Sequence, residues 1–161
     1  MKKYLFSLLF LIISCNNEPQ IVDVLITGGT IHDGSGNKGF VGNIAVKNDT
    51  VFYVGKKQNF IAKDTIDASN KIISPGFVNM LSWGYNTLMQ DGRSLSDLKQ
   101  GVTLEVFGEG TSPGPRGSIE NNNFVGFGEA MEELEQSGVS TNIASYLGAA
   151  TVRIQIGRAH V

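Results

Sequence analysis

The sequence predicts an α/β protein in which a small β domain precedes a layer of alternating strands and helices. Short β-type runs separated by turn residues fill positions 21 to 74. Apolar runs alternate with helix-forming segments over positions 75 to 155. Between the two patterns, Pro75-Gly76 fix a bend, and the short apolar run Phe77 to Met80 is typical of a strand buried in a parallel sheet.

Composition limits the class of protein. The 161 residues are 41% hydrophobic and 17% charged, which is typical of a globular chain. The formal net charge of −2 gives no electrostatic reason to expect a nucleic-acid partner. Cys15 is the only cysteine, so an internal disulfide is excluded, and no thiol remains after the leader to ligate a metal or act as a nucleophile.

Residues 1–15 have the pattern of an export signal. Two lysines precede an apolar run, Tyr4 to Ile13, that is shorter than the ~20 residues of a membrane-spanning helix. The end of this run, Ile12 to Cys15, resembles the lipobox of bacterial lipoproteins, in which the cysteine is lipidated. We therefore expect Cys15 to anchor the protein to a bacterial membrane, on the periplasmic or outer-membrane side of the cell envelope, with residues 16–20 as a tether. An ordinary secretory signal with a chance cysteine is the alternative.

Residues 21–74 predict a small antiparallel β domain. The first strand is interrupted by Gly28-Gly29, where we expect a bend or bulge. Lys47-Asn48-Asp49 lies between two β-type runs and predicts a hairpin, since Asn and Asp tolerate the positive φ of tight turns. Ala68-Ser69-Asn70 predicts a second hairpin in the same manner. A domain of this size has little core to stabilise it alone.

Residues 75–155 predict three strands with helices between them. A helix is expected from Leu95 to Gln100, with Gly101 as its stop, and a strand follows from Val102 to Phe107. The helix formers within Phe124 to Gln136 predict a second helix, and Val139 to Leu147 predicts the third strand. Strands joined by helices in this way are right-handed β-α-β units, the opening of an α/β layer or barrel.

Several of these runs resemble a known family. Asp23 to Thr30, Ile66 to Ala68 and Pro75 to Asn79 are similar, in order and spacing, to the amidohydrolase superfamily. Gly101 to Gly110 and Asn142 to Gly148 look like its N-acyl-D-amino-acid deacylase (D-aminoacylase) branch. The resemblance implies part of a β-sandwich followed by a TIM-like (β/α)₈ barrel. It also implies hydrolysis of the amide of a small N-acyl-D-amino acid by zinc-activated water.

The length implies that only part of such a barrel is present. A (β/α)₈ barrel needs about 250 residues, whereas about 80 follow Pro75, enough for the first three βα units. We therefore expect an inactive N-terminal fragment of a larger enzyme that binds one zinc ion, and we assign no catalytic residue within it. Residues 156–161 look like a translated sequencing adapter, so His160 is discarded as a site residue.

The family pattern is broken at the expected metal site. The resemblance places His-x-His after the Pro-Gly-Phe strand, but Leu81 and Trp83 stand there and cannot ligate a metal. A metal-binding Cys expected after the next strand is replaced by Gly110. Glu109, one position earlier, is a carboxylate at a strand end and is our candidate metal ligand. A surface or helix-capping carboxylate is the alternative for Glu109.

The other polar candidates have ordinary explanations. Glu105 lies within a strand and either faces the interior with a partner or is exposed at an open edge. We expect His32 to be a surface residue and Trp83 to pack rather than line a cleft. Asp91 is expected to cap the following helix, and Arg93 to be a solvated basic residue.

Two other functions stay open at this stage. One is an inactive, amidohydrolase-like binding lipoprotein, in which the metal ligands of the family have been replaced because metal binding was lost. The other is a hydantoinase-like or dihydroorotase-like cyclic amidase, which the resemblance supports less well.

Overall fold

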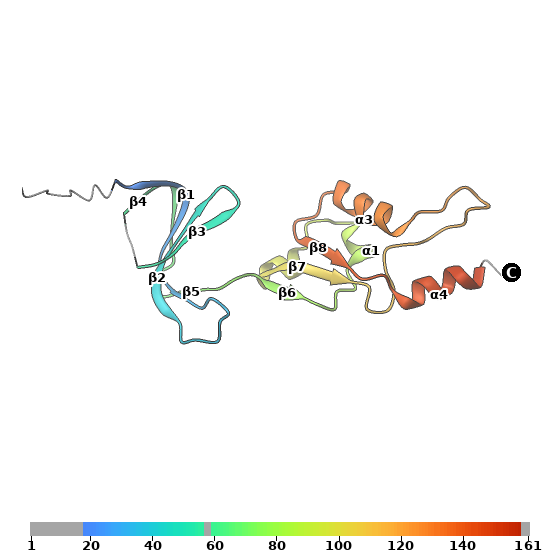
Figure 1. The fold of residues 1–161 in the computed structure, drawn as a ribbon, viewed down its shortest axis with the longest axis horizontal. Coiled ribbons are helices and arrows are strands. Elements are labelled where there is room, and N and C mark those ends of the chain that lie inside the picture. The colour runs from blue at the N-terminus through green and yellow to red at the C-terminus, as the bar shows by residue number, and fades with distance from the viewer. Residues whose placement is uncertain (1–17, 57–58, 159–161) are drawn as a thin grey trace, which may run out of the picture. The chain divides into compact units, whose positions relative to one another are not determined.

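The computed structural model describes residues 18–56 and 59–158 (Figure 1). The chain divides into two compact units, Met1–Pro75 and Gly76–Val161, and the division falls at the predicted bend. Cys15 and His160 lie outside the described residues, so the structure does not bear on the predicted lipid anchor. No helix within the described ranges is long and apolar enough to cross a membrane.

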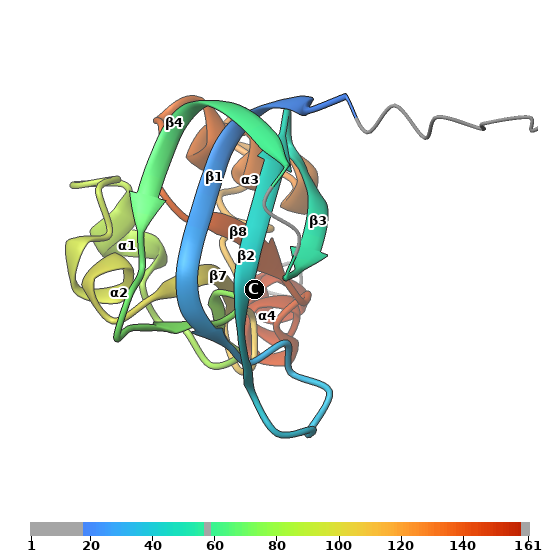
Figure 2. The same ribbon diagram turned by 90° about the vertical axis from the view of Figure 1, so that its left-hand side faces the viewer.

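The first unit contains one five-stranded sheet, visible face-on in Figure 2. Its strands are β1 (Gln20–Ile31), β2 (Phe40–Lys47), β3 (Thr50–Gly55), β4 (Phe60–Asp67) and β5 (Ile72–Ile73). The order is β3-β2-β1-β4, and β5 also pairs with β1. The β2–β3 hairpin is confirmed, with Asn48 at a φ of 52° in its turn.

The prediction of a wholly antiparallel domain with a second hairpin is wrong. Both β4 and β5 run parallel to β1 and do not pair with each other; β4 pairs with residues 20–27 of β1, and β5 pairs with its last two residues, Thr30 and Ile31. The turn between them is bonded to β1, since Ala68 N donates to Thr27 O (2.9 Å) and Thr30 N donates to Lys71 O (2.9 Å). The chain therefore runs alongside the bulge in β1 at this turn and keeps its direction, so no hairpin forms.

The glycine pair of β1 makes the predicted bulge. The register between β1 and β2 shifts between Ile26 and Gly29, and Gly28 has a φ of +73°. The Asn43 side chain fills the gap, because its Oδ1 accepts a hydrogen bond from Gly28 N at 3.1 Å. Val22, Leu25 and Ala45 form the small buried core of this unit.

The second unit contains a parallel sheet in the order β6-β7-β8. Its elements are β6 (Phe77–Asn79), α1 (Tyr85–Leu88), α2 (Leu95–Lys99), β7 (Val102–Phe107), α3 (Phe127–Gln136), β8 (Asn142–Ser145) and α4 (Ala149–Arg158). Leu88, Phe107 and Leu134 form its buried core, which joins α1 and α3 to the sheet.

The predicted elements of this unit are largely confirmed. β7 has the predicted bounds, and Gly101 and Gly138 take positive φ after their helices, as C-terminal stops do. β8 is shorter than predicted, because only Asn142 to Ser145 pair with β7. Helices α1 and α4 were not predicted; α1 is a single turn, and α4 carries β-branched residues that obscure its pattern.

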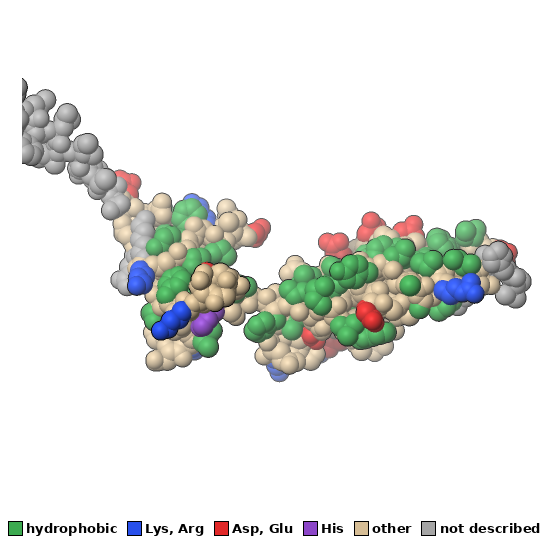
Figure 3. Space-filling view, turned by 60° about the horizontal axis from the view of Figure 1, so that its bottom comes forward, with side chains coloured by type: hydrophobic (Ala, Val, Ile, Leu, Met, Phe, Trp, Pro, Cys, Tyr) green, Lys and Arg blue, Asp and Glu red, His purple; other side chains and the backbone are tan. Residues whose placement is uncertain are grey.

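Many apolar side chains of both units are exposed, as the space-filling view shows (Figure 3). In the second unit they include Phe77 at 60%, Leu81 at 54% and Tyr146 at 60%. They lie in or next to the strands of the parallel sheet, which is the kind of sheet that is normally covered on both faces.

Replacing Gly108 by Ala should destabilise the protein by about 3 kcal/mol. Gly108 follows β7 with a φ of +91°, and an added Cβ would lie 2.0 Å from the Tyr146 carbonyl oxygen. Urea unfolding of the full protein measures the change. Gly128→Ala is the matched control: it lies in α3 with nothing within 4 Å of an added Cβ, so it should raise stability by up to ~1 kcal/mol. Equal stability of the two variants would contradict this account.

Candidate functional site

The carboxyl ends of β6, β7 and β8 lie at one edge of their sheet, because the strands are parallel. Ligand sites of parallel α/β proteins form at this edge, from the loops that follow the strands. A cavity of about 360 Å³ opens here between the loop after β6, the loop after β7 and helix α4. We call it the edge cavity. A second cavity of about 460 Å³, the acidic cavity, lies among β6, β7, α1 and α2.

Helix α4 closes one side of the edge cavity and is bonded to the loop after β7. Ser112 N donates a hydrogen bond to Thr151 Oγ1 at 2.8 Å, and Gln155 Nε2 donates to Pro115 O at 3.2 Å. Ser112 Oγ donates to Gly114 O within the same loop. The proline-rich loop is therefore held in place on the helix that follows the last strand.

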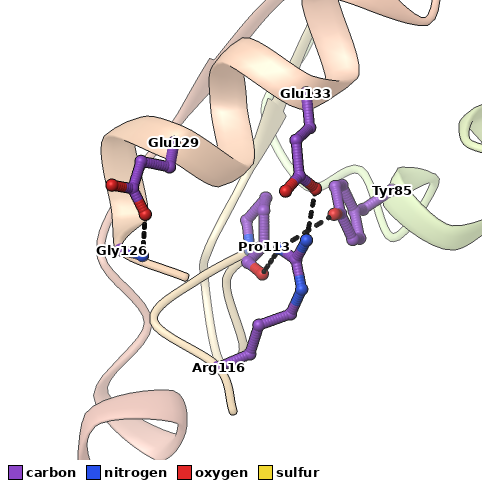
Figure 4. Close-up of polar contacts among 6 residues, drawn as sticks. All are labelled: Tyr85, Pro113, Arg116, Gly126, Glu129 and Glu133. Atoms are coloured by element: carbon purple, nitrogen blue, oxygen red, sulfur yellow. Dashed lines mark hydrogen bonds and ion pairs between the residues drawn. The ribbon is translucent and has the colours of Figure 1, made fainter. Parts of the chain in front are cut away.

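Arg116 is the charged residue of this cavity, and sequence reasoning did not single it out. Its Nη1 donates to Pro113 O (3.1 Å) and to the Tyr85 hydroxyl (3.4 Å), and its Nη2 forms an ion pair with Glu133 of α3 (Figure 4). A backbone bridge between Arg116 and Val125 closes the base of the loop. In the sequence, Arg116 is recognisable only as a basic residue directly after Ser112-Pro113-Gly114-Pro115. That position does not indicate which residues its side chain binds.

Glu105 is buried and faces the interior, so the first of the two alternatives predicted for it, an interior position with a partner, is confirmed. Its side chain is 2% exposed and accepts three hydrogen bonds from hydroxyls. The donors are Ser82 Oγ at 2.7 Å, Ser94 Oγ at 2.6 Å and Thr141 Oγ1 at 3.0 Å. Hydroxyls that converge in this way satisfy a carboxylate that burial would otherwise destabilise. Glu105 thus joins the loop after β6, the start of α2 and the residue before β8.

Glu109 is exposed in a bend two residues after β7, as the position at a strand end predicts. It lines neither of the two cavities at this edge. No group of three or more His, Cys, Asp or Glu side chains within the described ranges is placed to hold a metal ion. These residues therefore do not fit a zinc centre by themselves, and the role of Glu109 stays a prediction.

Leu81 and Trp83 offer no metal ligand, and the expectation that Trp83 packs is wrong. Its side chain is 66% exposed and lines both cavities. Ser82 Oγ donates to the buried Glu105, whereas Leu81 and Trp83 on either side of it are exposed. The Trp83 ring lies 3.5 Å from the position that a Cβ on Gly110 would occupy. The residues that replace the expected His and Cys are therefore neighbours in space.

The remaining candidates do not line the edge cavity. His32 is exposed in the first unit, as predicted. Asp91 does not cap α2; it accepts hydrogen bonds from the side chain of Arg93 at 2.8 and 2.7 Å and from its backbone N. The Arg93 guanidinium lowers the pKa of Asp91 to about 2. Both residues are exposed, so this pair belongs to the surface of the second unit.

Comparison with known proteins adds the decisive observation. No family model matches the chain. D-aminoacylase of Alcaligenes xylosoxydans xylosoxydans is 24% identical over 153 residues, which cover 87% of this chain and 32% of that protein. N-acyl-D-aspartate deacylase of the same organism is also 24% identical, over 88% of this chain and 31% of that protein. A crystal structure of D-aminoacylase matches with a TM-score of 0.71 at 25% identity, over 82% of this chain and 31% of that one.

The chain is similar in sequence and in fold to D-aminoacylase. The resemblance predicted from its motifs is thereby confirmed, and the chain matches the fold of the corresponding third of D-aminoacylase. N-acyl-D-glutamate deacylase from Bordetella bronchiseptica, solved with zinc and a phosphonate inhibitor, has the same fold at a TM-score of 0.73 and 23% identity. D-aminoacylase itself has been described with a binuclear metal center. The chain spans about a third of the length of the curated relatives that it matches.

Glu105→Leu should lower the free energy of unfolding by about 3 kcal/mol, because three hydroxyls lose their acceptor in the interior. Glu105→Gln keeps one carbonyl oxygen and should cost about 1 kcal/mol. Chemical denaturation of the full protein measures both. Glu132→Leu, which removes an exposed carboxylate from α3, is the control and should change stability by less than ~0.5 kcal/mol. If Glu105→Leu matched that control, Glu105 would not be the link between these segments.

Proposed function

We propose that the protein is an amidohydrolase that removes the acyl group from N-acyl-D-amino acids. The observation that carries this proposal is the likeness to D-aminoacylase in both sequence and fold. The edge cavity supports it as well, because it lies at the strand ends where enzymes of this architecture bind substrates. A small N-acyl amino acid is of a size that suits a cavity of about 360 Å³.

In this proposal the chain contributes part of a β-sandwich and the first three βα units of a (β/α)₈ barrel. The parallel order β6-β7-β8 and the exposed apolar side chains beside these strands support it. Zinc is the proposed cofactor, as in the deacylase solved with that metal. Glu109 is the proposed ligand from this chain, and the other ligands would come from outside the described residues.

Two alternatives have some support. Leu81, Trp83 and Gly110 favour a binding protein that has lost its metal, because these neighbours carry no ligating atom. A cyclic amidase is the weaker alternative. An L-hydantoinase from Arthrobacter aurescens matches with a TM-score of 0.52 at 18% identity, a likeness of fold alone.

The full protein should release free D-amino acid from N-acetyl-D-amino acids and leave the L enantiomers intact. Glu109→Gln keeps the shape of the side chain and removes the charge that attracts a cation, so we expect both bound zinc and turnover to fall at least ~10-fold. Metal analysis and an amino-acid release assay measure the two quantities. Glu120→Gln, another exposed carboxylate of the second unit, is the matched control and should keep both.

The outcomes separate the proposals. Absence of both bound zinc and hydrolysis of any N-acyl amino acid would favour the binding protein that has lost its metal, and opening of hydantoin rings would favour the cyclic amidase. Equal zinc content and equal turnover in Glu109→Gln and wild type would show that Glu109 is only a surface carboxylate.

We further propose that Cys15 is acylated and holds the protein on a bacterial membrane of the cell envelope, as its lipobox-like sequence suggests. Cys15→Ser should move the protein from the membrane fraction to the soluble fraction of cells that express the full gene. Asn16→Ser, one residue later, is the control and should stay with the membrane. Unchanged membrane association of Cys15→Ser would exclude the lipid anchor.

A further inference from the structure

The edge cavity has a largely apolar and aromatic wall. The side chains of this wall come from the loop after β6, from α1, from β7 and the loop that follows it, and from α4: Trp83, Tyr85, Phe107, Pro113, Pro115 and Ile154. Trp83 is 66% exposed and Ile154 is 51% exposed, although both line the cavity. A ligand in this cavity therefore meets apolar surface that is still in contact with water, and covering that surface favours binding.

Several polar side chains of the same cavity already have partners within the protein. Those with hydrogen bonds to protein groups are Ser82, Ser112, Thr151 and Gln155. A hydroxyl or amide that is bonded within the protein gives up that bond when it turns to a ligand, so the net gain from a polar ligand is small.

The charge of the edge cavity is neutralised. Arg116 is the only charged side chain among the described residues that line it, and its guanidinium forms an ion pair with Glu133 (Figure 4). The acidic cavity shares Trp83 with the edge cavity, and its described lining contains three carboxylates and no base. A carboxylate on a ligand therefore gains little from the first cavity and is repelled by the second.

An N-acyl amino acid has one charged end and one uncharged end. Its carboxylate and its side chain are attached to the same carbon atom, whereas the acyl chain is separated from that carbon by the amide. A side chain that entered the edge cavity would bring the carboxylate with it to the cavity, but an acyl chain can enter while the carboxylate stays in water. Because an unpaired charge is costly to remove from water, the lining favours entry of the acyl end.

We propose that the edge cavity binds the acyl chain of the substrate and that Trp83 selects apolar acyl groups longer than acetyl. This inference rests on the proposed function, which supplies the N-acyl-D-amino acid. Each methylene group of the chain that is fully buried against the wall should raise affinity about 4-fold. The indole ring of Trp83 offers the largest exposed apolar area of this wall, and Ile154 of α4 offers a second contact.

The test compares N-acetyl-D-alanine with N-hexanoyl-D-alanine, whose acyl chain is longer by four methylene groups, on the full protein. In wild type, kcat/KM should be at least ~30-fold higher for the hexanoyl compound. Trp83→Ser should reduce this ratio to ~5-fold or less and leave kcat/KM for the acetyl compound within ~3-fold of wild type. Trp83→Phe keeps an aromatic face and should keep most of the ratio.

Ile119→Ser is the matched control for Trp83→Ser. Ile119 is also an exposed apolar residue of the second unit, at 78%, but it lines neither cavity at the carboxyl edge. Its replacement should leave the ratio between the two compounds unchanged. A ratio near 1 in wild type, or the same ratio in Trp83→Ser and Ile119→Ser, would overturn the proposal.

An isomeric substrate separates the acyl chain from the amino-acid side chain. N-acetyl-D-2-aminoheptanoic acid has the composition of N-hexanoyl-D-alanine but carries the four added methylene groups on its side chain. The proposal predicts that kcat/KM for this isomer is at least ~10-fold below that of the hexanoyl compound. A smaller difference, or a higher value for the isomer, would show that the cavity does not select the acyl chain and would overturn the proposal.

Calorimetric titration keeps the acyl site separate from the proposed activity. If wild type hydrolyses none of these compounds, the amidohydrolase proposal fails. The acyl site still predicts that N-hexanoyl-D-alanine binds at least ~30-fold more tightly than N-acetyl-D-alanine and that Trp83→Ser removes most of this difference. Equal affinity of wild type for the two compounds, or no binding of N-hexanoyl-D-alanine, would overturn the acyl site whatever the activity.

Discussion

The second unit depends on one buried carboxylate. Glu105 lies in the middle strand of the parallel sheet, and the hydroxyls of Ser82, Ser94 and Thr141 donate to its two oxygens. Each donor comes from a different segment that flanks the sheet. An acceptor-only group with three donors around it is satisfied only in one arrangement of those segments, so a single side chain sets their relative positions.

The residues next to Ser82 lie at the surface. Ser82 is bonded to Glu105, Leu81 and Trp83 on either side of it are exposed, and the Trp83 ring lies close to Gly110. A Cβ added at position 110 would be in ordinary van der Waals contact with this ring, at 3.5 Å. Trp83 and Gly110, which both depart from the deacylase pattern, are therefore neighbours in space.

The edge cavity is built from segments that follow three different strands. The loop after β6, the loop after β7 and helix α4 meet there because parallel strands end at the same side of a sheet. Arg116 gives this cavity its only charge within the described ranges, and Glu133 positions that charge from α3.

The sequence by itself determined the strand β7, the hairpin at Asn48, the bulge at Gly28-Gly29, the helix stops at Gly101 and Gly138, and the resemblance to D-aminoacylases. These features depend on local backbone preference or on contiguous motifs. Only the tertiary structure decided that β4 and β5 run parallel to β1, that Glu105 is satisfied by three hydroxyls, and that Arg116 meets Tyr85 and Glu133. Those outcomes join residues that lie 11 to 42 positions apart, and no local pattern specifies which distant partner a strand or side chain will find.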